Sequence, residues 1–313
     1  MPKGFTNNTI ARKTTGSFYP KGNGITAVGL EFIDIALTQD HSQDRILIDL
    51  KHQSLGSRKQ FYNKYRGSGV PFIASHACVN GTSWHKPDLE PPLRNLEDFD
   101  IANGYVSIKY QPRGGFRLRV SQSSTPRPIY FNPWSINLYD EDILEIINSG
   151  GLIGIELDRR VIGTQNDQNE YFSEHDFPSE WMNARERTNL YDDTNDLDND
   201  MAPEDMLYFC QNVIHIVLIT TIEKRNSSGN YTNIHTVNPW DCICLGSDFD
   251  GLITAIEGGE SADKLTDFFE SGNKMQIVLQ KMARELGLGA VPVNVIDKLK
   301  NQNGIGFMRK HFV

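Results

Sequence analysis

Residues 241–251 read DCICLGSDFDG, a short apolar run that ends in glycine, serine and two aspartates. Three other runs share its apolar part: 45–50 (RILIDL), 70–75 (VPFIAS) and 152–157 (LIGIEL). Continuous apolar runs of this length are typical of strands that are buried on both faces of a parallel sheet. The sequence therefore predicts four parallel strands.

Helical patterns alternate with these runs. The expected helices lie at 28–37, at 140–148, from Pro203 onward, and at 261–271, 274–287 and 294–310. Alternating strands and helices indicate an α/β fold with a parallel sheet. A closed (β/α)8 barrel needs eight such units in about 250 residues, and only four are found. We therefore expect a partial TIM-barrel-type fold that forms a single domain over residues 1–313.

Two insertions interrupt the alternation. Residues 77–134 contain a Pro-rich stretch and two strand-like runs, 105–110 and 116–120, around the sequence QPRGG. This pair predicts a β-hairpin with a longer loop. Residues 164–205 hold 13 Asp and Glu against two Arg, which predicts a polar surface loop outside the core. The aspartates of this segment lack the glycine and glutamate spacing of an EF-hand calcium loop.

Composition excludes several classes of protein. Apolar residues make up 38% and charged residues 23% of the 313, an ordinary mixture for a globular protein. The net charge of −9 argues against a nucleic-acid partner. No apolar run approaches the roughly 20 residues of a membrane span, and the first residues lack the apolar core of a secretory signal. The cell compartment stays open.

Polar residues gather at three of the predicted strand ends. The first strand runs into Lys51 and His52, the second into His76, and the last into Asp248 and Asp250. In parallel α/β folds the chemistry sits at the carboxyl ends of strands. Neutral imidazoles bind zinc, and a carboxylate can move protons during the hydrolysis that a metal ion promotes. The pattern indicates a metal-dependent hydrolase.

The chain resembles the renal, or membrane, dipeptidase family of zinc peptidases in the amidohydrolase superfamily. The most specific match is CLGSDFDG at 244–251, which is similar to the family's Gly-Ser-Asp-Phe-Asp-Gly strand end. The other matches follow in family order: GITAVGLEFIDIAL, ILIDLKH, PFIASHACVN, LYDEDILEIINSGGLIGI and VIDKLKNQNGIGFMRKHF. Together these stretches resemble the C-terminal half of the family's barrel.

The resemblance implies roles for individual residues. His52 and His76 match the two histidines that hold the family's second zinc ion, and Asp248 matches the carboxylate that shuttles protons. Asp250 is then expected in a turn or behind the metal ligands. Glu156 and Arg159 lie at the end of the third predicted strand, where they either contribute to the substrate site or form a local salt bridge or rim contact.

The chain also departs from the family pattern. The family's first zinc ion needs a His-x-Asp pair, and a Glu further along bridges both ions; both precede the Asp-Leu-x-His strand by well over a hundred residues. Residues 1–44 contain no His-x-Asp pair. Alignment of the acidic helix places Ile136 where the family has its substrate-binding Arg, next to Asn137. The Arg94-Asn95 dipeptide repeats that pattern upstream, but we interpret it as loop sequence.

Two hypotheses follow. The first is a metal-dependent hydrolase that cleaves a small peptide or related amide, with the N-terminal half of its barrel supplied by the same gene or by a separate subunit. The second is a binding or structural protein derived from that enzyme, without its binuclear metal site. A homo-oligomer would cover the sheet edges of either. His52, His76 and the Gly-Ser-Asp-Phe-Asp-Gly strand end favour the first hypothesis. The absent His-x-Asp pair and Ile136 favour the second.

Overall fold

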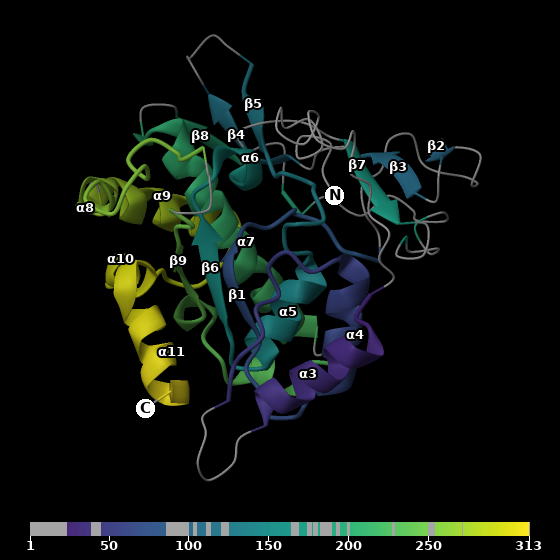
Figure 1. Ribbon diagram of the computed structural model, residues 1–313. Coiled ribbons are helices and arrows are strands. Elements are labelled where there is room, and N and C mark those ends of the chain that lie inside the picture. The colour runs from purple at the N-terminus through teal and green to yellow at the C-terminus, as the bar shows by residue number, and fades with distance from the viewer. Residues whose placement is uncertain are drawn as a thin grey trace.

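The computed structural model describes residues 24–38, 45–85, 100–102, 105–110, 114–119, 125–163, 169–173, 177, 181, 190–191, 195–198, 201–226, 229–249, 254–270 and 272–312. Its centre is a parallel sheet of three strands in the order β1 (Ile73–Ala77), β6 (Leu152–Glu156) and β9 (Ile243–Gly246). Figure 1 shows this sheet between the helices of the N-terminal and C-terminal parts of the chain. The protein is therefore a mixed α/β structure, as the alternation of runs predicts.

The first of the four predicted strands along the chain, residues 45–50, is present only in part. Asp49 forms a single parallel bridge with Ile73, and the backbone N–H of Leu50 donates to the carbonyl of Ile73 at 2.9 Å. At its other end this stretch turns away, because the N–H of Ile46 donates to Ala36 instead. The segment thus lies beside β1 without forming a continuous ladder of hydrogen bonds. Its last residues still lie at the end of the sheet where β1 ends.

The predicted helices are present in order, and two further helices, at Leu55–Tyr65 and Arg159–Ile162, were not predicted. Their bounds are α3 Ala27–Leu37, α4 Leu55–Tyr65, α5 Asp140–Asn148, α6 Arg159–Ile162, α7 Glu204–Asn226, α8 Leu265–Glu270, α9 Gly272–Glu285, α10 Val295–Asp297 and α11 Asn303–Phe312, with a π-helical turn η6 at Lys298–Gln302 and short 3-10 turns η4 at Thr232–His235 and η5 at Pro239–Asp241. Helix α5 coincides with its predicted range. Its first turn carries three acidic residues, which suit the positive end of the helix dipole, and Gly150 ends it with a φ of 73°.

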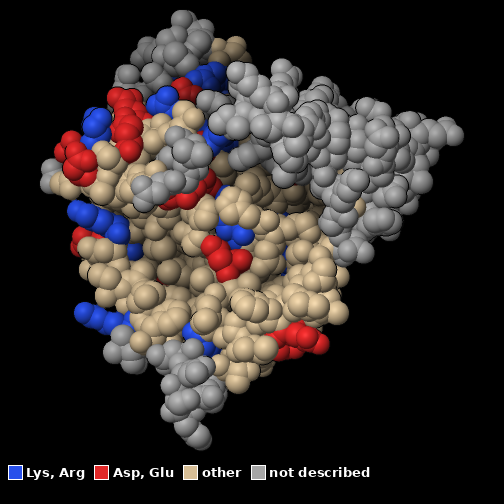
Figure 2. Space-filling model, viewed as in Figure 1, with Lys and Arg blue, Asp and Glu red and all other residues tan. Residues whose placement is uncertain are grey.

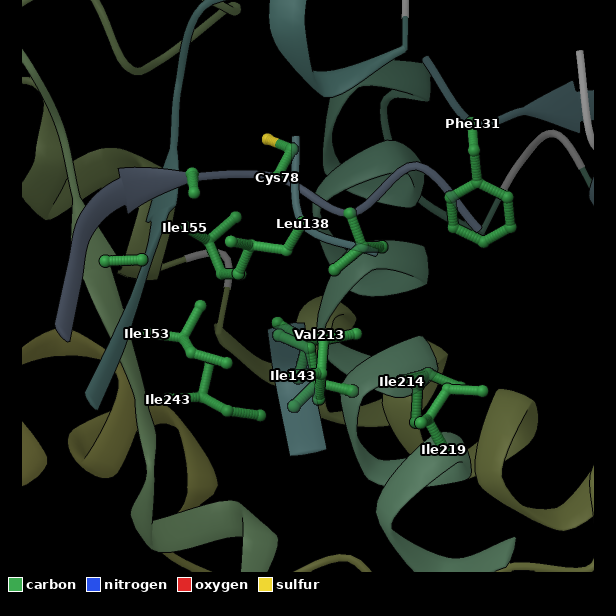
Figure 3. Packing of buried hydrophobic residues seen from close by; sticks show 14 of the residues in the cluster. Cys78, Phe131, Leu138, Ile143, Ile153, Ile155, Val213, Ile214, Ile219 and Ile243 are labelled. Carbon is green, nitrogen blue, oxygen red and sulfur yellow. The ribbon is translucent and has the colours of Figure 1, made fainter. Parts of the chain in front are cut away.

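The core lies between the sheet and helices α5 and α7. Figure 3 shows Ile153 and Ile155 of β6 and Ile243 of β9 in one cluster with Ile143 and Val213 from the two helices. Helix α7 is long and apolar enough to cross a membrane by length and composition, yet 83% of its most apolar window is buried inside the protein. That burial is typical of a core helix.

The predicted hairpin of the first insertion is wrong. Strand β3 (Tyr105–Lys109) pairs with β2 (Asp100–Ala102) and β7 (Asn169–Ser173), whereas β4 (Gly114–Arg119) pairs with β5 (Arg127–Tyr130) and β8 (Asp196–Asp198) in another sheet. Contacts with α7 explain the separation. The N–H of Phe116 donates to Oε1 of Gln211 at 2.9 Å, and a Cβ at Gly115 would lie 2.2 Å from that oxygen. Strand β4 is therefore held against α7 and away from β3.

The prediction that 164–205 stays outside the core is also wrong in part. The segment contributes β7 and β8 to the two sheets, and Trp181, Tyr191 and Leu197 are buried. Several of its described carboxylates have donors there. Glu170, for example, accepts from the hydroxyl of Tyr110 at 2.9 Å. The acidic content of the segment thus did not keep it out of the core. A buried carboxylate such as that of Glu170 is tolerated because a hydrogen-bond donor satisfies it.

Charged side chains are unevenly placed on the face seen in Figure 2. The described part of this face is mostly uncharged, with most Lys, Arg, Asp and Glu near its margins and a small acidic and basic group near its centre. No broad basic patch lies on the described residues in this view.

Candidate functional site

Three residues from different segments meet at the carboxyl end of the parallel sheet. His76 lies on β1, His52 in the turn after residues 45–50, and Asp248 just beyond β9. The Nε2 atoms of His52 and His76 are 3.1 Å apart, and Oδ2 of Asp248 is 3.9 Å from Nε2 of His76. The expected proximity of these side chains is therefore confirmed.

The backbone is strained at two of these three residues. His52 has a φ of 67° and Asp248 a φ of 51°, and no other non-glycine residue in the described ranges has a positive φ. The left-handed region costs a residue with a side chain about 1–2 kcal/mol. Such conformations cluster at functional sites, where the surrounding structure holds them. Their coincidence here with the polar strand ends marks this edge of the sheet as the candidate site.

A bulge in β1 and two glycines position His76. The register between β1 and β6 shifts between Ala74 and Ala77, so the backbone of the intervening residues bows over the sheet. A Cβ at Gly154 would lie 2.1 Å from the carbonyl oxygen of Ser75, and one at Gly246 would lie 2.2 Å from the same atom. Only glycine at both positions leaves room for the bulge that carries His76.

The protonation of His76 follows from its neighbours. The hydroxyl of Ser75 lies within hydrogen-bond distance of both the Asp49 carboxylate and, at 2.6 Å, Nδ1 of His76. A carboxylate only accepts, so the hydroxyl donates to Asp49 and accepts from Nδ1–H of His76. The proton is thereby fixed on Nδ1, and Nε2 of His76 presents a lone pair towards His52. Metal-binding histidines are commonly oriented in this way.

Electrostatics keep both imidazoles neutral. Partial burial lowers the pKa of His52 and of His76, and the nearby Lys51 ammonium lowers both further. Asp248 and Asp49 oppose this effect without reversing it. Neutral imidazole is the form that binds a metal ion.

The weaker candidates have other partners. Glu156 accepts from the ammonium of Lys51 at 2.6 Å, with both side chains buried. Arg159 forms an ion pair with Asp205 at 2.8 Å, so Glu156 and Arg159 each take part in a salt bridge. Asp250 lies outside the described residues.

The residue that aligns with the family's anchor arginine offers no replacement for it. Ile136 is half-buried. The amide of its neighbour Asn137 donates to the carbonyls of Asn132 and Val161 at 3.0 and 2.9 Å. The guanidinium expected from the resemblance is therefore absent at this position, and Asn137 serves the packing of α6.

Sequence reasoning located three further residues at the strand ends but assigned no role to them. Asp49 and Ser75 orient His76, and Lys51 sets the local charge. Each is a polar residue at the end of an apolar run, so the signal was present in the pattern DLKH and in the residue before His76.

The two histidines fit part of a zinc site. Two ligands of a tetrahedral zinc ion with bonds of roughly 2.1 Å lie about 3.4 Å apart, close to the 3.1 Å between the two Nε2 atoms. Across the described residues, no group of three or more His, Cys, Asp or Glu side chains is arranged to hold a metal ion. The described part of the chain thus offers two ligands, one fewer than the three protein ligands of typical catalytic zinc.

Comparisons with known proteins give distant structural likenesses. A metallo peptidase from Rhodobacter sphaeroides, liganded with a phosphinate mimic of the dipeptide L-Ala-D-Ala, is similar with a TM-score of 0.43 and 15% identity over 95% of this chain and 50% of that one. Dipeptidase AC, also a metallo peptidase, gives the same TM-score and identity over 95% of this chain and 52% of that one. The chain therefore spans about half the length of these proteins. No protein-family model and no curated protein matches it. Likeness at this level does not assign the chain to a family.

Proposed function

We propose that this chain is part of a metal-dependent hydrolase of the dipeptidase type, which cleaves a peptide or related amide bond. The observation that supports this most strongly is the convergence of His52, His76 and Asp248 at one sheet edge, with the two Nε2 atoms 3.1 Å apart. The same three residues lie in the motifs that resemble the dipeptidase family. The metal ion in this proposal is zinc, held by the two imidazoles.

Each residue of the site has a task in that reaction. A divalent ion bound there would polarise the amide carbonyl and make water a better nucleophile at neutral pH. Ser75 and Asp49 hold the His76 imidazole with Nε2 free to bind. The Asp248 carboxylate accepts a proton from the attacking water and passes it to the leaving amine nitrogen, because it lies beside the same imidazole.

The remaining ligands come, in this proposal, from outside the described residues. In this proposal, residues 45–50 and strands β1, β6 and β9 form the second half of a (β/α)8 barrel, whose first half would carry the other ligands. That half belongs to the same gene product or to a separate subunit. A second copy of this chain would cover the sheet edges, but the sequence contains no His-x-Asp pair to complete the site.

The substrate in this proposal is a small peptide or amide that does not depend on an arginine at position 136. Ile136 cannot bind a carboxylate, so recognition of the free C-terminus falls to another residue or is not required. Substrates with a blocked C-terminus should therefore be tested alongside simple dipeptides. A preference for blocked substrates would agree with the loss of the guanidinium.

Metal binding by the purified chain tests the proposal directly. Zn²⁺ is titrated by calorimetry and Co²⁺ by visible absorption, for the wild type and for His52→Asn, His76→Asn and His235→Asn. His235 is an exposed histidine on η4 and serves as the matched control. We expect one ion per chain, affinity lowered about tenfold or more by each of the first two substitutions, and no change with His235→Asn. Absence of binding in the wild type, or equal binding in all variants, would refute the metal site.

The alternative function is a non-catalytic binding or structural protein of the same fold. The buried Lys51–Glu156 pair favours it, because an ammonium beside the two histidines opposes a dication. Its signature in the same titration is a folded chain that binds neither Zn²⁺ nor Co²⁺. Measured binding with the dependence on His52 and His76 described above contradicts a loss of metal binding, and hydrolysis of a dipeptide by the metal-loaded chain would then exclude a non-catalytic role.

A further inference from the structure

We propose that two copies of this chain associate through helix α3 of one copy and helix α11 of the other. This inference goes beyond the proposed function and does not depend on it, because both helices lie towards the amino ends of the strands, away from the candidate site (Figure 1). It concerns two exposed helix faces whose apolar residues have the same spacing and whose charges are opposite.

Helix α3 exposes large apolar side chains on one face. Val28, Phe32 and Ile35 are 74%, 68% and 74% exposed, and their spacing of four and three residues places them on the same side of the helix. Glu31 is exposed on that side as well, and these four residues are called the α3 face below. Exposed apolar surface of this kind marks an interaction site more often than a free surface.

Helix α11 carries a matching face. Ile305 and Met308 are 48% and 54% exposed, Arg309 is exposed and Phe312 is half-buried. These four residues, the α11 face, lie at positions i, i+3, i+4 and i+7 of the helix, which is also the spacing of the α3 face. Two helix faces with the same spacing can pack along their whole length.

The two faces lie apart within one chain. Helix α3 is held beside residues 45–50, because the N–H of Ile46 donates to the carbonyl of Ala36 at 2.7 Å. Helix α11 starts beside β9, where the amide of Asn303 donates to the carbonyl of Ile243 at 2.7 Å. These are the two ends of the strand order, and Figure 1 shows α3 and α11 on opposite sides of the sheet. Contact between the faces therefore requires two copies.

Charge decides which face meets which. Helix α3 contains two acidic residues and no Lys or Arg, whereas α11 contains Arg309 and Lys310 and no acidic residue. Figure 2 shows acidic atoms at the margin where α3 lies and basic atoms at the margin where α11 lies. Pairing of α3 with α3, or of α11 with α11, would oppose like charges, which is unfavourable. Pairing of α3 with α11 brings Glu31 and Arg309, each in the middle of its face, within reach of each other.

A second copy is therefore the partner that fits, because the chain itself carries the complement of each face. Around a two-fold axis the contact forms twice, and closed pairs of this symmetry are the commonest oligomers. The contact joins helices, so the free edge of residues 45–50 stays available to the other barrel half in the proposed function. Because the faces are short, we expect a weak dimer, with a dissociation constant between about 1 µM and 1 mM.

Sedimentation equilibrium of the purified chain over a range of concentrations tests the contact. Phe32→Asp and Met308→Asp should each weaken association about tenfold or more. Ile277→Asp is the matched control, because Ile277 on α9 is 54% exposed, as Met308 is, and it should associate like the wild type. A wild-type chain that stays monomeric up to about 1 mM, or equal weakening by the control, would overturn the inference.

Charge reversal identifies the two helices as partners. Glu31→Arg and Arg309→Glu should each weaken association about fivefold or more, and the double variant should associate within about twofold of the wild type. Both residues are exposed, so these variants are expected to fold, which circular dichroism checks. Weakening by both single variants without recovery in the double variant would overturn the pairing of α3 with α11. Tighter association of Glu31→Arg alone would do so too, because it would indicate contact between two α3 helices.

Discussion

Gly246→Ala is expected to damage the site without touching any of its polar side chains. The new Cβ would lie 2.2 Å from the carbonyl oxygen of Ser75 and 2.9 Å from Cα of His76. Both atoms belong to the backbone of the β1 bulge, so no side-chain rotation relieves the overlap. Ordinary contacts of this kind begin above 3 Å, and the bulge must therefore move by about 1 Å.

The expected size of the effect follows from that shift. Overpacking of a rigid interior costs typically about 1–3 kcal/mol, which we expect as a loss in the free energy of unfolding. The imidazole of His76 moves with its backbone, while ligand distances in metal sites must be met within about 0.2 Å. Metal affinity should therefore fall about tenfold or more, whether or not the stability loss is large.

Two measurements and one control check this expectation. Urea unfolding followed by circular dichroism gives the stability, and Co²⁺ titration gives the affinity. Gly289→Ala is the control, because a Cβ there would have no neighbour within 4 Å and the residue has no positive φ. It should change stability by less than about 0.5 kcal/mol. A folded Gly246→Ala variant that binds metal like the control would show that the bulge does not position His76.

Three further predictions concern stability. Burial, aided by Asp140, raises the pKa of Glu141 to about 7 from 4.5, so the folded state binds this proton more tightly than the unfolded chain. The free energy of unfolding should therefore fall between about pH 4.5 and 7, by about 3 kcal/mol at most, and Glu141→Gln should flatten that fall in urea titrations at several pH values. Arg58→Met should cost about 3–5 kcal/mol in the same assay, because it leaves the Asp142 carboxylate buried without its cation; a loss below 1 kcal/mol would contradict this. His52→Asn should keep or raise the melting temperature, because Asn tolerates the left-handed conformation better than most residues, while it lowers metal affinity about tenfold or more. A clear loss of stability would argue against strain at this position.

The parallel sheet and the position of the site could be predicted because their signals are local. Each apolar run carries its own polar end, and the carboxyl ends of parallel strands meet at one edge of the sheet. That rule alone places His52, His76 and Asp248 together. Helix α5 was equally readable, since an acidic first turn and a Gly-Gly stop mark its two ends.

The pairing of the inserted strands could not be predicted because it depends on distant partners. Strand β3 pairs along its whole length with β7, about sixty residues further along the chain, and nothing in either strand specifies the other. The side chain of Gln211 on α7 decides where β4 lies. The adjacency of two strand-like runs is weaker than these contacts, so the hairpin rule failed.

Asp49 links the two histidines in a way that no local pattern reveals. Its Oδ1 accepts from the backbone N–H of Lys51 at 3.1 Å and from that of Ser75 at 3.0 Å. The first bond closes the turn in which His52 takes its left-handed conformation, and the second fastens the bulge that carries His76. The same carboxylate accepts from the Ser75 hydroxyl, which sets the tautomer of His76. One side chain thus fixes the backbone of one imidazole and the proton of the other, and it holds the strained turn in place because three donors converge on it. In the sequence, Asp49 is only a polar residue near the end of an apolar run. In the structure, it links the two histidines of the candidate metal site.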